Sequence, residues 1–171
     1  MRKVAAACGV SHAAPYSHFK NKEELLTAMK EHITNQFSSI LEDRIQEHEK
    51  DLNMLDALGK AYVEFFVEHP DYFSFLFYQA NVSIDLTMKE ESSGYRPFDL
   101  YRTQVIKILE AQHYPKEGYQ DVILSLWSFV HGIASLATMK HVHYEGVWEE
   151  KISDFMKLFD CDFLKKEVSD S

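Results

Sequence analysis

The sequence contains few of the residues that interrupt helices. Its 171 residues include only 6 Gly and 4 Pro, the two residue types least compatible with a helix interior. We therefore expect long helices joined by few turns. A hydrophobic content of 46% and an aromatic content of 13% are enough for a substantial core. Because the elements expected around this core are helices, the predicted fold is all-α.

Cysteine is also scarce. Cys8 and Cys161 are the only two cysteines and stand near opposite ends of the chain, a pattern that indicates no disulfide framework and fits a reducing compartment. The N-terminus lacks the sustained apolar run of a signal peptide, and no stretch of about 18 uncharged apolar residues is present. We expect a cytoplasmic protein without a membrane span.

The common signatures of catalysis are missing. The sequence has no Gly-rich phosphate loop, no Gly-x-Ser-x-Gly and no Cys/His metal pattern. His131 and the pair His141-x-His143 are not joined by a Cys or a carboxylate at ligand spacing. We therefore expect no enzyme activity, no metal and no cofactor.

Acidic residues are absent from the first 22 positions. This segment contains Arg2, Lys3, Lys20 and Lys22 and carries a charge of +4, whereas the remainder carries −13, which gives the net charge of −9. A basic segment on an acidic body is what a phosphate-facing module needs, because a uniformly acidic protein is repelled by DNA. The charge pattern therefore favours nucleic-acid binding through the N-terminal segment.

Residues 4–26 are predicted to form a short helix, a tight turn, a second short helix and the start of a long one. Gly9 suits the left-handed position that follows a helix end, and Ser11 is placed to cap the next helix. Asn21 and Glu24 resemble a capping box at the start of the long helix. This order predicts a helix-turn-helix, whose second helix enters a DNA major groove.

The residue identities in this segment carry a more specific resemblance. Gly9-Val10-Ser11, Tyr16-x-His18-Phe19 and Lys22-Glu23-x-Leu25-Leu26 resemble the DNA-binding signature of the tetracycline-repressor (TetR) family of bacterial transcriptional regulators. The resemblance implies a homodimeric regulator, more often a repressor, that binds a palindromic site in double-stranded DNA. DNA contacts are then expected from Arg2, Ser11, His12, Ala13, Ala14, Tyr16, Ser17, His18 and Lys22.

The start of the chain departs from the family pattern. In this family a first helix precedes the helix-turn-helix, and here Met1 falls at the start of the second helix. We therefore expect the DNA-binding domain, residues 1–30, to be incomplete, whether through a misassigned start codon, a shortened record or a natural truncation. The alternative function is a truncated form that dimerises and binds an effector but does not bind DNA.

The remaining residues are predicted to form a body of amphipathic helices over 31–166, followed by a disordered tail at 167–171. The resemblance implies that this body binds a small-molecule effector and that its last two helices form the dimer interface. Helices are expected over 22–49, 54–68, 70–78, 98–112, 119–140 and 147–166, with a loop over 81–96.

Aromatic residues are concentrated between positions 62 and 101, and ordinary core packing is the alternative for each of them. Apolar cavities lined by aromatic side chains are typical small-molecule sites. Trp127-x-x-x-His131-Gly132 resembles the C-terminal domain of one TetR subgroup and places Trp127 and His131 on one helix face; a buried, hydrogen-bonded histidine is the alternative. We expect an apolar effector in contact with Tyr62, Phe65, Phe66, Phe73, Phe77, Tyr101, Trp127 and His131, with Tyr78 as a further polar anchor.

Overall fold

The computed structural model of the chain describes residues 2–48, 53–89 and 92–162. Within these residues every regular element is a helix, which confirms the predicted all-α fold. The elements are α1 (Arg2–Ala7), α2 (Ala14–His18), α3 (Lys22–Glu47), α4 (Met54–Glu68), α5 (Pro70–Tyr78), α6 (Arg96–Ala111), the 3-10 helix η1 (Lys116–Gly118), α7 (Tyr119–Thr138) and α8 (Glu150–Asp162).

Helix ends agree best with the predictions in the middle of the chain. Helices α4 and α5 have the bounds expected from sequence, and α6 begins two residues early at Arg96 because Pro97 fits the first helical turn. Helix α7 ends at Thr138, before the predicted residue 140, and α8 begins at Glu150 instead of 147. The predicted tail, 167–171, lies outside the described residues.

The first turn of the head is formed as the sequence predicts. Gly9 has a φ of +66°, a conformation that side chains other than glycine's disfavour. The Val10 amide donates to the Ala5 carbonyl at 3.0 Å, and the Gly9 amide donates to the Ala6 carbonyl at 3.2 Å. This pair of bonds is the Schellman arrangement that ends a helix, so the predicted role of Gly9 is confirmed.

The prediction that Ser11 caps the second helix is wrong. Helix α2 begins at Ala14, and Ala13 occupies the cap position without a side-chain hydrogen bond. Ser11 contributes only its carbonyl, which accepts from the Ala14 amide at 3.0 Å. The helix starts next to Pro15, whose fixed φ and missing N–H suit a first turn. His12 and Ala13 therefore lie in the turn before α2.

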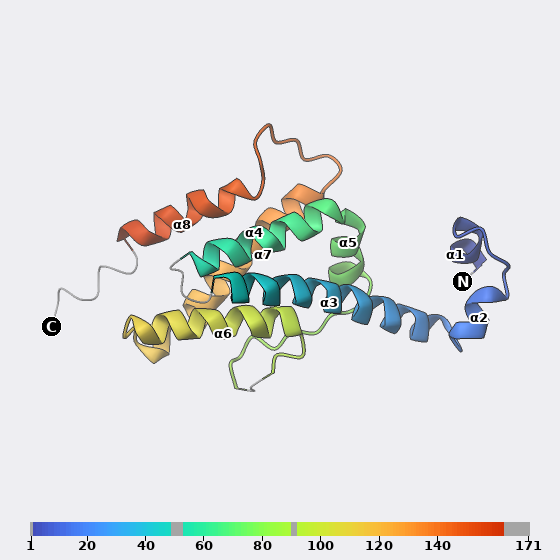
Figure 1. Ribbon diagram of the computed structural model, residues 1–171, viewed down its shortest axis with the longest axis horizontal. Coiled ribbons are helices and arrows are strands. Elements are labelled where there is room, and N and C mark those ends of the chain that lie inside the picture. Colours follow the sequence, from blue (N-terminus) through green and yellow to red (C-terminus); the bar gives the residue numbers. More distant parts are fainter. Residues whose placement is uncertain (1, 49–52, 90–91, 163–171) are drawn as a thin grey trace.

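Helix α3 joins the head to the body and begins with the predicted cap. Asn21 Oδ1 accepts from the Glu24 amide at 2.8 Å, and Glu24 Oε2 accepts from the Lys20 amide at 2.5 Å. Figure 1 shows α1 and α2 at one end of the molecule, with α3 running from them along the body between α4 and α6. The helix continues without a break through residue 30, the predicted boundary between the two domains.

Helix α4 lies at the centre of the body and packs against α3, α7 and α8. Glycine at position 59 permits a close approach of α8, because a Cβ there would lie 2.6 Å from Ile152 Cγ2. Helix α8 is further attached by Phe155, whose ring stacks on Phe129 with centroids 3.5 Å apart. Helix α8, which is expected to form part of the dimer interface, is therefore held against α4, the helix that carries Tyr62.

Helix α7 has one face in the core and another that remains uncovered in the single chain. Val122, Ile123 and Trp127 are among its buried residues, whereas Leu124 and Leu136 are 39% and 43% exposed. Among the described helices, only the segment Lys116–Thr138 is long and apolar enough to cross a membrane, by length and composition alone. Core helices of soluble proteins meet the same criterion, and the buried face of α7 is such a core surface.

Candidate DNA-binding head and effector site

The residues expected to contact DNA are gathered in the head, on α1, α2, the turn between them and the first residue of α3 (Figure 1). All of them are exposed except Ala14, which is half-buried. Tyr16 is 56% exposed although its ring is large and partly apolar. Ser17 also bonds within its own helix, because its Oγ donates to the Ala14 carbonyl at 2.7 Å. The DNA contacts themselves stay a prediction.

The head is electrostatically suited to a polyanion. Arg2, Lys3, Lys20 and Lys22 are all exposed, and none of their side chains is held in an ion pair within the part of the chain that the structure describes. Unpaired surface cations are available to replace counterions on a nucleic-acid backbone. The basic segment recognised in the sequence therefore forms one exposed, positively charged head.

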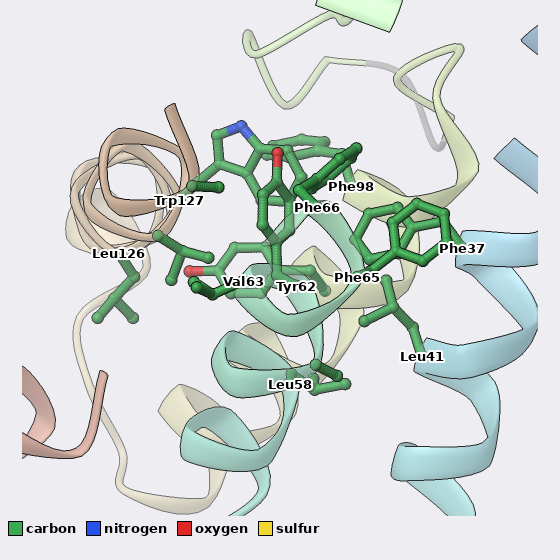
Figure 2. Packing of buried hydrophobic residues seen from close by; sticks show 14 of the residues in the cluster. Phe37, Leu41, Leu58, Tyr62, Val63, Phe65, Phe66, Phe98, Leu126 and Trp127 are labelled. Atoms are coloured by element: carbon green, nitrogen blue, oxygen red, sulfur yellow. The ribbon is translucent and has the colours of Figure 1, made fainter. Parts of the chain in front are cut away.

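A group of aromatic side chains fills the centre of the body, and we call it the aromatic cluster. Figure 2 shows Phe37 and Leu41 reaching from α3 toward the rings of α4, while Trp127 enters from α7. All eight residues expected to contact the effector belong to this cluster. Its members are Phe37, Tyr62, Phe65, Phe66, Phe73, Phe77, Tyr95, Phe98, Tyr101, Trp127 and His131.

A polar pair lies inside the cluster. Tyr62 Oη and His131 Nδ1 share a hydrogen bond of 3.0 Å. Burial raises the pKa of Tyr62 well above its usual value, and burial lowers the pKa of His131, because an apolar environment disfavours the charged form of each group. Both side chains are therefore held neutral near pH 7. The rings that face His131 are those of Phe73 and Phe77, with centroids 5.0 and 4.6 Å away.

Trp127 forms the other side of the cluster. Its ring lies 5.2 Å from Tyr62 and 5.0 Å from Phe98, both edge to face, and 5.4 Å from Tyr101. The Tyr101 hydroxyl donates to the Ile123 carbonyl over 3.4 Å. Edge-to-face rings at these distances are a favourable packing arrangement, so Trp127 fixes α7 against both α4 and α6.

The aromatic cluster is nearly closed in this structure. The space that Tyr62, Tyr101 and Trp127 line together has a volume of about 10 Å³, which is close to the smallest cavity that holds one water molecule. Among the described residues, the mainly apolar cavity expected from the sequence is therefore not formed at this place, because the rings fill the volume themselves. A benzene-sized ligand needs a cavity of about 150 Å³, so the cluster must open to admit one.

The expected ligand residues do not all face this space. Phe65 stacks on Phe37 at 4.9 Å, on the side toward α3. Tyr78 is 65% exposed on the surface, so the expectation that it anchors a ligand inside the body is wrong. Aromatic density alone did not separate Tyr78 from the buried Phe73 on the same short helix, α5.

Three members of the cluster, Phe37, Tyr95 and Phe98, were missed as candidate site residues. Phe37 was recognised only as part of the apolar face of the long helix, although its ring contacts Tyr62, Phe65 and Phe66. Tyr95 was expected in a loop and is 3% exposed. The aromatic density of the region was the available signal, but it does not say which ring points inward.

The burial of His131 predicts a pH dependence of stability. Because the folded pKa lies below the unfolded value of about 6.5, the unfolded chain holds more protons between these two pH values. The free energy of unfolding should be unaffected by this group above pH 6.5 and should fall as the pH drops from 6.5 to the folded pKa. Thermal unfolding between pH 7.5 and 5 should show a smaller loss for His131→Gln than for the native chain. Identical slopes for the native chain and His131→Gln would contradict the prediction.

Comparisons with known proteins agree with this architecture. Residues 1–29 match the sequence model of the family described as bacterial regulatory proteins, tetR family, and residues 55–156 match the model described as tetracyclin repressor-like, C-terminal domain. No curated protein matches the chain. A solved structure described as a protein with unknown function from Rhodococcus sp. RHA1 is 26% identical, with a TM-score of 0.72 over 92% of this chain and 81% of that chain.

The exposed helix-turn-helix, the connecting helix and the helical body together define a DNA-binding transcriptional regulator. The chain belongs to the TetR family of bacterial regulators. Regulators of this family are dimers that act by binding DNA and are generally not enzymes.

Proposed function

We propose that this regulator is a repressor whose two heads bind a palindromic operator and which an apolar small molecule releases from DNA. The observation that carries the proposal is the position of Phe37. This ring lies on α3, the helix that bears the head, and it packs 5.1 Å from the ring of Tyr62, which is bonded to His131. A ligand that opens the aromatic cluster would displace Tyr62 and therefore bias the position of α3.

The effector is expected to be largely hydrophobic or aromatic, with one or two hydrogen-bonding groups. Tyr62 and His131 supply neutral polar groups within an apolar surround. Arg102 lies 5.9 Å from the ring centroid of Phe98 but is paired with Asp99 at 3.1 Å, so it is poorly placed to bind a phosphate. Phosphorylated metabolites are therefore disfavoured.

The dimer interface is expected on α7 and α8. Leu124, Leu136 and Met139 are between 39% and 48% exposed, and Phe155 and Met156 are only half-buried. Exposed apolar side chains that gather on neighbouring elements are typical of an association surface. A two-fold axis through this surface would present two copies of α2 to the half-sites of one operator.

Head binding is tested most directly at Lys22. We expect Lys22→Ala to weaken binding to all DNA sequences by a similar factor and to flatten the dependence of log K on log salt by about one unit, because one phosphate contact is lost. Titrations of operator and unrelated DNA at several salt concentrations measure both effects. Lys107→Ala removes the same charge from an exposed position on α6 and should change neither. An altered sequence preference with an unchanged salt slope would contradict a phosphate role for Lys22.

A second candidate function is favoured by the apolar surface of the head. Val4 and Val10 are 45% and 47% exposed, and exposed apolar side chains on a small element favour association or covering by another segment. In this alternative the chain dimerises and binds an effector without binding DNA. A gel shift on operator DNA should compare the chain with a version extended upstream. Binding by the extended version alone would support the alternative, and equal binding by both would reject it.

A further inference from the structure

Within the part of the chain that the structure describes, the hydroxyl of Tyr95 has no hydrogen-bond partner. Tyr95 precedes the first residue of α6 and is 3% exposed. Its Oη is buried, and no donor or acceptor among the described residues reaches it. Burial also raises the pKa of this hydroxyl well above its usual value, so the group stays protonated. Buried polar atoms in native proteins nearly always have a partner, which makes Tyr95 a candidate for pairing with a molecule from outside the chain.

Tyr95 lies next to the polar pair of the aromatic cluster. Its ring is edge-to-face with Phe77 at 6.1 Å, and Phe77 in turn lies 4.6 Å from the His131 ring. The proximity of Tyr95 also contributes to the raised pKa of Tyr62. The unpaired hydroxyl therefore belongs to the same interior region as the Tyr62–His131 hydrogen bond, which is 3.0 Å long.

The same tyrosine lines a groove that is open to the surface. The groove lies between α3 and the segment before α6 and has a volume of about 180 Å³. Lys30, Glu31, Thr34 and Asn35 line it from α3. By contrast, the space at Tyr62 and Trp127 is only about 10 Å³ and is not lined by Tyr95. Tyr95 connects the groove to the aromatic cluster in another way, because its ring lines the groove and also contacts Phe77 of the cluster.

The segment that carries Tyr95 is held at its base by hydrogen bonds to one carboxylate. Asp99 accepts from the Ser93 amide at 2.8 Å and from Ser92 Oγ at 3.0 Å. Ser93 Oγ donates to the Tyr95 carbonyl at 3.2 Å. The backbone of Tyr95 is thus held by hydrogen bonds, whereas no hydrogen bond among the described residues holds its hydroxyl. Any opening at this residue would therefore require the ring to rotate.

We propose that Tyr95 is the gate between the surface groove and the aromatic cluster and that its hydroxyl pairs with the effector. The inference rests on the proposed function, in which the effector occupies this cluster. The ligand class that follows is a neutral aromatic molecule with a hydroxyl group. Its ring replaces the volume that the Tyr95 ring gives up, and its hydroxyl bonds to Tyr95 Oη. A pure hydrocarbon gains only the apolar contacts.

The test uses phenol and toluene as matched probes, since they have the same ring and similar size but only phenol carries a hydroxyl. Binding to the full chain is measured by titration followed in amide NMR spectra, with thermal shift as a second readout. We expect the native chain to bind phenol about tenfold more tightly than toluene, a ratio that corresponds to about 1.4 kcal/mol. Tyr95→Phe should remove this preference by weakening phenol about tenfold, with toluene unchanged within a factor of about two.

Two further variants separate the gate from a general structural effect. Tyr78→Phe removes a hydroxyl from a side chain that is 65% exposed and should leave both affinities as in the native chain. Tyr95→Ala removes the ring itself and should strengthen toluene binding, because it creates space next to the cluster. In the native chain and in each variant, the backbone amides whose NMR chemical shifts change on binding should lie around Tyr62 and His131.

The outcomes distinguish the gate from the function on which it rests. If phenol and toluene bind at the cluster with affinities that Tyr95→Phe leaves unchanged, or weakens equally, the role of Tyr95 is refuted and the effector site stands. If neither probe binds to the native chain or to Tyr95→Ala, the inference and the proposed aromatic effector site are both refuted. A selective loss of phenol binding in Tyr95→Phe, with Tyr78→Phe unchanged, supports the inference.

Discussion

Glutamate in place of Phe155 should convert the dimer to monomers and abolish tight operator binding. The Phe155 ring stacks on Phe129 at 3.5 Å between α7 and α8, the two helices proposed to meet their symmetry mates. A carboxylate in such an apolar contact costs several kcal/mol unless it is paired. Operator affinity should fall by orders of magnitude, because each monomer then holds only one half-site.

Sedimentation at micromolar concentration measures the dimer directly, and a gel shift on the operator measures its consequence. Ile133→Glu on α7 should have the same effect, since its side chain is half-buried on the proposed interface helix. Lys157→Glu introduces the same side chain at an exposed position of α8 and should leave the dimer intact. Far-UV circular dichroism separates dissociation from unfolding. A native chain that sediments as a monomer, or a folded dimer of Phe155→Glu, would refute the proposed interface.

Of the substitutions proposed for this chain, Phe37→Ala should cause the largest loss in the free energy of unfolding. Phe37 is fully buried on α3 and contacts Tyr62, Phe65 and Phe66 on α4, with ring centroids between 4.9 and 5.2 Å away. Phe37→Ala leaves a cavity that close-packed neighbours fill only in part, so the free energy of unfolding should drop by about 3–5 kcal/mol. The position of α3, and with it the head, should then respond less to any ligand in the cluster.

Urea unfolding at a fixed chain concentration measures the first effect, because the stability of a dimer depends on protomer concentration. Ile40→Ala is the matched control, since Ile40 lies on the same helix and is 36% exposed; its loss should stay below about 1 kcal/mol. A loss of that small size for Phe37→Ala would show that α3 is not held to α4 by this ring. The weaker response of α3 and the head to a ligand in the cluster is measured as a smaller change in operator affinity when phenol is added.

The sequence predicted the helices of the body and the turn of the head because these depend on local interactions. Glycine at position 9 meets a conformational requirement of its own backbone, and Asn21 caps α3 through a bond to a residue three positions away. Proline at the start of α5 and apolar spacing along α4 likewise act within one helix. A local rule failed at Ser11, where the competing local signal was Pro15, four residues later, in the first turn of α2.

The family resemblance also came from the sequence, since the signature of the head lies in one continuous segment. That segment matches the family over residues 1–29, and the body matches over residues 55–156. The basic charge of the head was visible for the same reason, because the residues that carry it are neighbours along the chain. The separation of a DNA-binding segment from a helical body therefore needed no tertiary information.

Only the tertiary structure decided what the aromatic residues do. The hydrogen bond between Tyr62 and His131 joins residues 69 positions apart, and helical spacing does not determine which distant ring a side chain meets. The same limit explains why Tyr78 was expected inside and lies outside, and why Tyr95 was expected in a loop and is buried. Whether a cavity is open depends on how rings from five helices and a loop fill a shared volume. Close packing sets that volume to within a methyl group, whereas composition reports only that enough aromatic side chains are present to fill it.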